Sequence, residues 1–319
     1  MAFASSSDSA LAVAAQTTFG TATSGSGFQY MRFTGEGLGY NAETTASEEI
    51  DATRNVADSV RTAVSAGGSI DFELSRDDVT DLILQSALQS TATFDAGSEA
   101  EFNGTTERLL TIEKKVVGTA AEYFLFDSLA VSSLSVNIEP GSIVTCTAEL
   151  LGASQAAASL SSTISAPTAA GTGSVINAVH GSNQIKLADV DGVGAAYENV
   201  QSLNFTIDNG LREQRRIGTT SLGGLGSGRF VVTGSVTMYF ETNAEYNKFI
   251  NDTGRELEVI LTDGTYGYTF MMPKIKYTSA SVLASGNDSD VVATFEFQAL
   301  KHTVGSDTYT MLITRDEAA

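Results

Sequence analysis

Hydrophobic and polar residues alternate along residues 67–74, and the spacing then changes to that of a helix. Ile70, Phe72 and Leu74 are separated by acidic residues, which is the period-two pattern of a strand with one buried face. After Ser75, which is placed to cap a helix, apolar residues recur at three-and-four spacing. The apolar positions of this expected helix are Val79, Leu82, Ile83 and Ala87.

The same order recurs in residues 233–252. Apolar residues alternate with polar ones from Val236 to Phe240, and Thr242 with Glu245 then forms an S/T-x-x-E capping box. The expected helix that follows has Tyr246, Phe249 and Ile250 on its apolar side. A strand that leads into a short helix is therefore predicted twice.

The segments around these two stretches also correspond. Each half is expected to open with a strand and a long loop, and to continue after the helix with three more strands. The expected segments are 28–40, loop 41–66, 107–116, 123–136 and 142–152 in the first half, and 200–210, loop 211–229, 255–264, 266–279 and 290–300 in the second. This order predicts an internal duplication at a spacing of about 165 residues, far longer than a solenoid repeat.

The pattern predicts a mainly β protein with two tandem homologous domains, each a β-sandwich with a short flanking helix. We expect a flexible N-terminal arm at 1–27, a first domain at 28–152, a connector at 153–196, a second domain at 197–302 and a C-terminal tail at 303–319. The connector begins as an Ala/Ser/Thr/Gly run typical of flexible linkers. Its later part, "NQIKLADV", is compatible with an edge strand.

Charge and composition narrow the class of function. The chain of 319 residues has 38 acidic and 18 basic residues, which gives a formal net charge of −20. This charge disfavours binding to nucleic acid or to an anionic membrane. One cysteine, Cys146, excludes an internal disulfide, and its alternating surroundings predict a buried thiol. No basic N-terminal region or unbroken apolar segment indicates a secretion signal.

Candidate catalytic and ligand sites are sparse. We expect His180 and His302 to lie in loops or at strand ends rather than beside a nucleophile. Residues 189–192, "DVDG", resemble the start of a calcium loop, but Val200 stands where the closing Glu belongs, so a turn is expected. The glycines of residues 223–228 lack dinucleotide-binding spacing and are expected in a loop. The sequence therefore favours a structural or interaction protein with no cofactor over an enzyme.

Several stretches together resemble the tail tube proteins of tailed bacteriophages, from about residue 28 to residue 300. They are "SEEIDATRNVADSVRTAVSAGGSIDFELSRDDVTDLILQSAL", "LTIEKK", "YFLFDSLAVSSLSVNIEPGSIVTCTAELLG", "LNFTIDNGLREQRRIG" and "FVVTGSVTMYFETNAEYNKFI". The resemblance implies a β-sandwich with a flanking helix, whose copies form rings that stack into the hollow tube through which DNA leaves the virion. Because single-domain members of the family form rings of six, a duplicated chain is expected to need three copies per pseudo-sixfold ring.

The resemblance also implies partners and a location. Besides its own copies, these are the tape measure protein, the tail terminator and the distal tail or baseplate proteins, with transient, non-specific passage of DNA. The protein is expected in the virion tail after assembly in the host cytoplasm, and two fused tube domains favour a long non-contractile, siphovirus-type tail.

The two long loops are expected to join rings along the tube, because their charges are opposite. The proposed contact residues are Glu48, Glu49 and Asp51 in the first loop and Arg212, Arg215 and Arg216 in the second. The same loops also carry Glu43 and Arg229. If both loops are simply solvated, single exposed ion pairs contribute only about 0 to 1 kcal/mol.

Two alternatives remain open at this point. A monomeric β-sandwich binding module, such as an adhesin, is disfavoured by the missing signal peptide and the absence of Trp. The second alternative is another tail component with the same domain, such as a completion or distal tail protein. Self-polymerisation is the property that distinguishes a tube protein from such a component.

Overall fold

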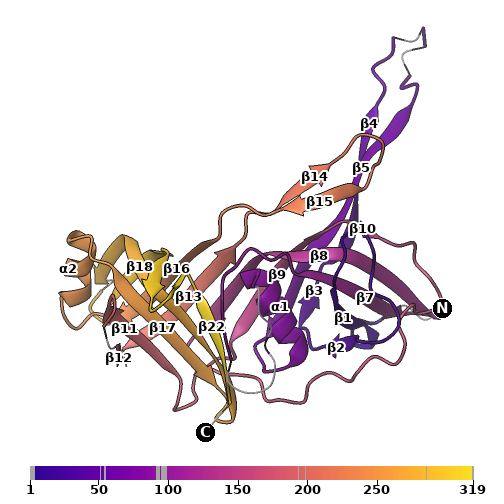
Figure 1. Cartoon of the computed structure of the whole chain (residues 1–319). Coiled ribbons are helices and arrows are strands. Elements are labelled where there is room, and N and C mark those ends of the chain that lie inside the picture. The colour runs from indigo at the N-terminus through magenta and orange to yellow at the C-terminus, as the bar shows by residue number, and fades with distance from the viewer. Residues whose placement is uncertain are drawn as a thin grey trace.

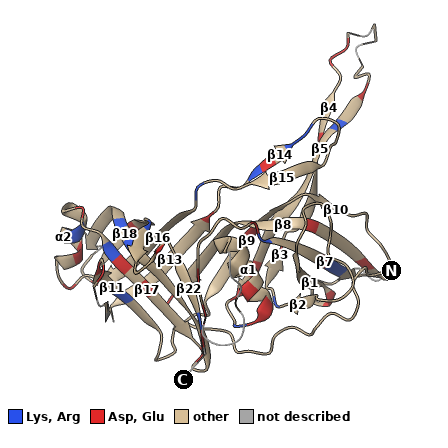
Figure 2. Ribbon diagram, in the orientation of Figure 1, with Lys and Arg blue, Asp and Glu red and all other residues tan. Residues whose placement is uncertain are grey.

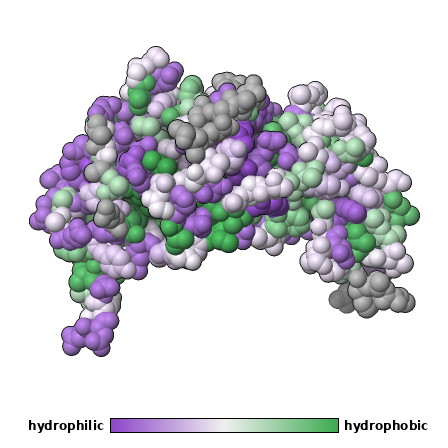
Figure 3. All heavy atoms as spheres, turned by 90° about the horizontal axis from the view of Figure 1, so that it is seen from below, coloured by the Kyte–Doolittle hydropathy of each residue, from purple (hydrophilic) through white to green (hydrophobic). Residues whose placement is uncertain are grey.

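Antiparallel strands make up most of the computed structural model (Figure 1), which confirms the mainly β prediction. The structure describes residues 4–50, 52–53, 55–90, 94, 99–192, 194–197, 199–284 and 286–317. Within these residues, an 18-stranded network of paired strands is accompanied by two separate hairpins and two α-helices. Seen from below, the molecule is arched, and its hydrophobic surface is divided into separate patches (Figure 3).

The first half contains the strands up to the connector and the longer helix. After a 3₁₀ turn at Ser6–Asp8 come β1 (Ala10–Gln16), β2 (Gln29–Met31), β3 (Gly35–Glu36), β4 (Gly39–Ala46), β5 (Ser59–Glu73), α1 (Asp78–Leu88), β6 (Glu99–Phe102), β7 (Leu109–Val117), β8 (Ala121–Ile138), β9 (Thr145–Gly152) and β10 (Ser154–Gln155). The strands expected from the hydrophobic pattern correspond to β2–β3, β5, β7, β8 and β9.

The second half follows the same general order. Its elements are β11 (Gln184–Asp189), β12 (Ala195–Ala196), β13 (Val200–Asp208), β14 (Arg212–Arg215), β15 (Leu222–Gly226), β16 (Val231–Tyr239), α2 (Ala244–Ile250), β17 (Arg255–Thr262), β18 (Tyr266–Ala284), β19 (Val291–Ala299), β20 (His302–Val304), β21 (Asp307–Tyr309) and β22 (Leu312–Glu317). The edge strand suggested by "NQIKLADV" is β11, which pairs with β17.

Two long strands, β8 and β18, each take part in two sheets. The first part of β8 pairs with β7, and its last part pairs with β9 and β13. Likewise, the first part of β18 pairs with β17 and β22, and its last part pairs with β19. Each long strand therefore has different neighbours along its two parts, and β8 in this way connects the β1–β2–β7 strands to the rest of the sheet.

The two halves are joined by strand pairing at two places. β13 of the second half pairs along the end of β8 of the first half, so one sheet continues in the order β5–β9–β8–β13–β16–β19–β18. β22 pairs with both β18 and β6. Beside it, the Asn103 Oδ1 accepts a hydrogen bond from the Thr310 N–H, 207 positions further along the chain. The boundaries between the predicted domains stay a prediction.

Helix α1 differs from its expected cap and its expected single apolar face. Asp77 is the N-cap, and its Oδ1 accepts a hydrogen bond from the Thr80 N–H at 2.9 Å, whereas Ser75 lies two residues earlier. Polar residues of the helix, among them Asp81 and Gln85, are buried as completely as the apolar ones. The reason is that α1 packs against β1, β2, β6 and β8, so several of its sides are covered.

Helix α2 also departs from its predicted pattern. Its N-cap, Asn243, makes no side-chain cap bond, and Glu245 does not close the expected capping box. Glu245 is the buried residue of this helix, whereas Ile250, expected on the apolar side, is 62% exposed. The Glu245 carboxylate instead forms a buried ion pair with Arg255, described below, and is therefore not available to bind the backbone at the start of the helix.

The expected N-terminal arm and flexible connector are both docked on the first half. Residues 10–16 of the arm form β1, which pairs with β2 and β7 and buries Leu11 and Val13. The connector contributes β10 and isolated bridges, such as that of Ser159 with Tyr123. In the arm, Ala12 and Ala14 are buried, whereas most residues of the connector between 156 and 169 are exposed although they lie along the first half. Part of the expected C-terminal tail is likewise the paired strand β22.

The two expected long loops are β-hairpins. β4 and the first part of β5 form a hairpin that projects far from the body, and β14–β15 lies beside it (Figure 1). The Val64 N–H donates to the Thr220 carbonyl at 3.0 Å and ties the two hairpins together. The glycines expected in a loop at 223–228 lie partly in β15. Both faces of a projecting hairpin meet solvent, so its residues lack the apolar alternation that marks a strand.

Candidate functional site

One face of the sheet shared by the two halves is mainly polar, with Val231, Tyr239 and Val292 as apolar members on the same side. The opposite face carries the core, including Phe72, Val136, Phe205 and Phe295. The polar residues in register on the mainly polar face, from β5, β9, β8, β13, β16 and β19, are Ser69, Asp71, Glu73, Thr145, Thr147, Glu149, Ser133, Ser135, Asn137, Asn204, Thr206, Asp208, Thr233, Ser235, Thr237, Thr294, Glu296 and Gln298. The period of two along each strand puts them on one side.

Hydroxyl and carboxylate groups bridge neighbouring strands on this face. The Thr147 hydroxyl donates to Asp71 at 2.7 Å between β9 and β5. The hydroxyl oxygens of Ser135 and Thr206 lie 2.9 Å apart across the junction between the halves. These cross-strand bonds hold the polar side chains in ordered rows.

The charge of these rows is acidic. Their ionisable members are Asp71, Glu73, Glu149, Asp208 and Glu296, and none is basic. Lys276 lies at the far end of this face, on β18, and is paired with Asp252. A surface of this kind repels phosphate and presents hydroxyl groups in place of a basic binding patch.

The projecting hairpins carry the residues predicted to join rings. Glu48 and Glu49 are exposed near the tip of the β4–β5 hairpin, and Asp51 lies outside the described residues. On the neighbouring hairpin, Arg212 donates to the Ser227 carbonyl, and the Arg216 side chain lies over Gly223. Figure 2 shows red acidic segments and a blue basic one on the first hairpin, and blue basic segments beside a red acidic one at β14.

Within one chain, Arg215 is already paired. It lies 3.2 Å from Glu43 of the first hairpin and also contacts Glu213 on its own strand. The structure therefore brings the two hairpins together through Glu43 rather than through Glu48 or Glu49. The Glu43 side chain is 70% exposed, so this ion pair contributes only about 0 to 1 kcal/mol.

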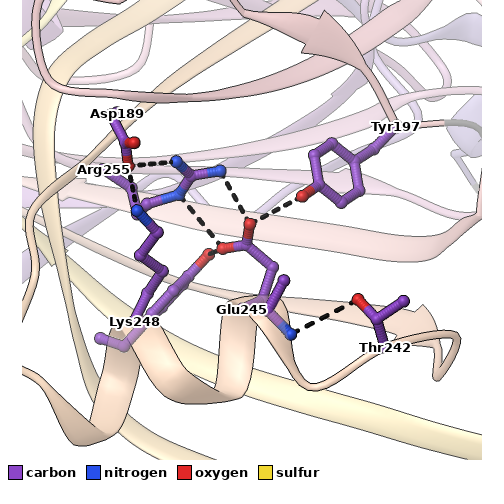
Figure 4. A network of polar contacts seen from close by, with 8 residues as sticks. Asp189, Tyr197, Thr242, Glu245, Lys248 and Arg255 are labelled. Atoms are coloured by element: carbon purple, nitrogen blue, oxygen red, sulfur yellow. Dashed lines mark hydrogen bonds and ion pairs between the residues drawn. The ribbon is translucent and has the colours of Figure 1, made fainter.

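A buried ion pair fixes α2 against the second half (Figure 4). The guanidinium of Arg255, on β17, donates from Nη2 to Glu245 Oε1 at 2.7 Å and from Nε to Oε2 at 3.1 Å. The hydroxyls of Tyr197 and Tyr277 donate to the same carboxylate at 2.7 and 3.0 Å. Each oxygen of Glu245 thus accepts two hydrogen bonds, which satisfies a buried charge.

Asp189 extends this network to the surface. It lies 2.5 Å from Lys248 of α2 and 2.7 Å from Arg255. Hydrogen bonds from Lys248 and Arg255 hold the pKa of Asp189 below its ordinary value. Burial, followed by the hydrogen bond to Glu245, raises the pKa of Tyr197 to about 12, so its hydroxyl remains a donor at neutral pH. No local pattern in the sequence indicated this ion pair, because Glu245 also fits a capping box.

A second buried network crosses between the halves. Asp81 of α1 accepts a hydrogen bond from the Tyr268 hydroxyl at 2.7 Å and lies 3.0 Å from Arg315 of β22. Burial raises the pKa of Asp81 to about 6, although Tyr268 and Arg315 both favour its ionised form. Helix α1 is therefore attached to two strands of the second half.

The other candidate residues lie as the sequence predicted. Cys146 is buried on β9, and burial raises the pKa of its thiol to about 12. His180 lies in a loop, and His302 at the start of β20 contacts Asp191 at 2.9 Å. Residues 189–192 form a turn in which the Gly192 N–H donates to the Asp189 carbonyl.

The described residues contain neither a metal-binding cluster nor a membrane-spanning helix. Across residues 4–317, apart from the gaps given above, no group of three or more His, Cys, Asp or Glu side chains is arranged to hold a metal ion. Neither α-helix in this part of the chain is long and apolar enough to cross a membrane.

The family follows from comparison with known proteins. A family model described as "Phage tail tube protein" matches residues 6–299, nearly the whole chain. The chain belongs to the phage tail tube protein family. No curated protein sequence matches this tail tube protein significantly. The family is one of structural virion proteins, so the polar sheet face and the projecting hairpins are surfaces of a tail component.

Proposed function

We propose that copies of this tail tube protein close into rings, that the rings stack into a hollow tube, and that phage DNA passes through it to the host. The observation that carries the proposal is the polar, acidic sheet face that continues across both halves. Turned toward the lumen, its carboxylates repel DNA phosphates, which keeps the passage from adhering to its cargo. Ring closure also protects the terminal strand edges of the sheet.

The ring contains three chains in this proposal. Support comes from the order of the elements, which is similar in the two halves. The first half has an opening strand followed by β5, α1, β7, β8 and β9, and the second half has β13 followed by β16, α2, β17, β18 and β19. Three such chains present six similar units around an axis. The arched outline in Figure 3 agrees with an arc of a ring.

Stacking of the rings is assigned to the projecting hairpins. Glu48, Glu49 and Asp51 of one ring meet Arg212, Arg215 and Arg216 of the next, so that opposite charges repeat around the interface. Individually weak ion pairs then act together. The tube ends on a tail terminator and on distal tail or baseplate proteins, surrounds the tape measure protein during assembly, and is built in the host cytoplasm.

Electron microscopy of the purified protein at high concentration tests the proposal. The expected result is hollow tubes or rings with three chains and six similar lobes in views down the axis. Six chains per ring would reject the three-chain stoichiometry. Persistent monomers, even with the rest of a tail assembly present, would favour an isolated β-sandwich binding module. Rings that never stack would favour another tail component.

A further inference from the structure

The sheet shared by the two halves has two end strands. At one end, β3 and β4 pair with β5. At the other end, residues 279–284 of β18 pair with β19. Among the described strands, neither end has a partner on its outer side. Each end therefore offers backbone N–H and C=O groups to a further strand.

The pairing registers of the two halves repeat at a constant offset. In the first half, the β7–β8 ladder has an irregularity between Leu110 and Ile112, and in the second half the β17–β18 ladder has one between Arg255 and Leu257. The partners of these residues are Leu129 and Phe126 on β8 and, correspondingly, Ile275 and Met272 on β18. A matching residue of β18 thus exists for each of these positions on β8.

A second irregularity continues the same correspondence toward the end of each strand. It falls between Val131 and Ser133 in the β8–β9 ladder, and between Tyr277 and Ser279 in the β18–β19 ladder. Because bulges fix the register of the strand beyond them, the final residues of β8 and β18 also correspond. Leu134, Val136 and Ile138 match Ala280, Val282 and Ala284.

The junction inside the chain shows what covers such an end. On β8, Leu134, Val136 and Ile138 lie opposite Ile207, Phe205 and Leu203 of β13. The strand β13 pairs with β16 in the second half in the same register as residues 36–41 pair with β5 in the first half. By this correspondence, the counterparts of Leu203, Phe205 and Ile207 are Glu36, Leu38 and Tyr40. The free end of β18 and the free β3–β4 end are therefore the counterparts of the two strands that meet at the internal junction.

Exposure of the matching side chains supports a missing neighbour. Val136 is 1% exposed at the internal junction, whereas its counterpart Val282 is 37% exposed. Ile207 is fully buried, whereas its counterpart Tyr40 is 38% exposed. A strand laid against each end in the internal register would cover both side chains and remove apolar surface from water.

We propose that β18 of one copy pairs antiparallel with β3–β4 of the next copy in the register of the internal β8–β13 junction. Val282 then lies opposite Leu38, and Ser281 lies opposite Gly39, as Ser135 lies opposite Thr206 within the chain. The partner is a second copy of this chain, so the inference rests on the proposed ring. It specifies which strands meet and in which register.

Engineered cysteine pairs test the register. Gly39→Cys combined with Ser281→Cys places two thiols opposite each other between copies, and a Cβ at Gly39 meets nothing within 4 Å. Ser135→Cys with Thr206→Cys is the matched control, since its native oxygens are 2.9 Å apart within one chain. Gly39→Cys with Ser279→Cys reports a register slipped by two residues. The native Cys146 is buried, so it does not form disulfides with the engineered cysteines.

After mild oxidation of assembled protein, non-reducing gels separate the outcomes. We expect Gly39→Cys/Ser281→Cys to give covalent species of two and three chains at least tenfold more abundantly than the slipped pair, while the control pair cross-links within one chain. Rings or tubes in which the slipped pair dominates, or in which neither pair cross-links, would overturn the register and leave the proposed function standing. Absence of rings, with only the control pair cross-linked, would overturn both.

Discussion

Removing the carboxylate of Glu245 is expected to destabilise the unassembled chain strongly. Glu245→Ala takes away the acceptor of two bonds from Arg255 and of one bond each from Tyr197 and Tyr277. The Arg255 side chain is only 7% exposed, so its charge is left with Asp189 alone. Breaking a buried pair in this way costs about 3–5 kcal/mol of the free energy of unfolding.

Urea denaturation followed by far-ultraviolet circular dichroism measures this loss. Glu241→Ala is the matched control, because Glu241 is exposed just before α2, and its removal should change stability by less than about 0.5 kcal/mol. Tyr277→Phe removes one bond to the carboxylate and should cost about 1.5–3 kcal/mol.

A double-mutant cycle with Arg255→Met isolates the pair itself. Since the two residues contact each other directly, we expect a coupling energy of at least about 2 kcal/mol. A Glu245→Ala variant that loses no more stability than Glu241→Ala would refute the reasoning that this buried network holds α2 in place.

Three further predictions concern pH, the sheet face and the hairpins. The folded chain binds the Asp81 proton more tightly than the unfolded chain, because the pKa rises from 3.8 to about 6, so stability should fall by about 2 kcal/mol as the pH rises from 4 to 6; Asp81→Asn should flatten that slope in urea titrations. Tubes carrying Glu149→Lys and Glu296→Lys should retain DNA on sedimentation at low salt and release it at high salt, whereas unaltered retention would argue against a lumenal position. Arg215→Glu with Arg216→Glu should block tube growth in electron micrographs while the monomer's circular dichroism stays unchanged; normal tubes would contradict the stacking role.

Much of the strand and helix order could be predicted from the sequence, because one buried face imposes a regular hydrophobic period. Ile70 and Phe72 alternate as β5 requires, and the same signal located β17 after α2, whereas β6, which directly follows α1, was not predicted. The prediction failed where that period is absent. Residues 40–46 of β4 and 59–62 of β5 are exposed on both faces, and β1 is built largely of alanine.

The assembly surfaces were harder to predict, because they depend on residues far apart in sequence. The polar residues on each strand look like an ordinary solvated face, and only pairing across β8 and β13 reveals that they form one continuous surface. The ion pair of Asp81 and Arg315 was also hidden, since helix and strand are separated by most of the chain. Local patterns carry no information on such pairings.

The contact of β6 with β22 has a consequence for the timing of protein synthesis. The hydrogen-bond partner of Asn103 is Thr310, which lies 207 positions later in the chain. At a translation rate of about 5–20 residues per second, Thr310 is synthesised about 10–40 s after Asn103. During this interval the first half has an open strand edge at β6, and the Asp81 carboxylate of α1 lacks its contacts with Tyr268 and Arg315. The first half therefore reaches its final fold only once β22 has emerged from the ribosome, and until then its open edge offers backbone groups to other chains.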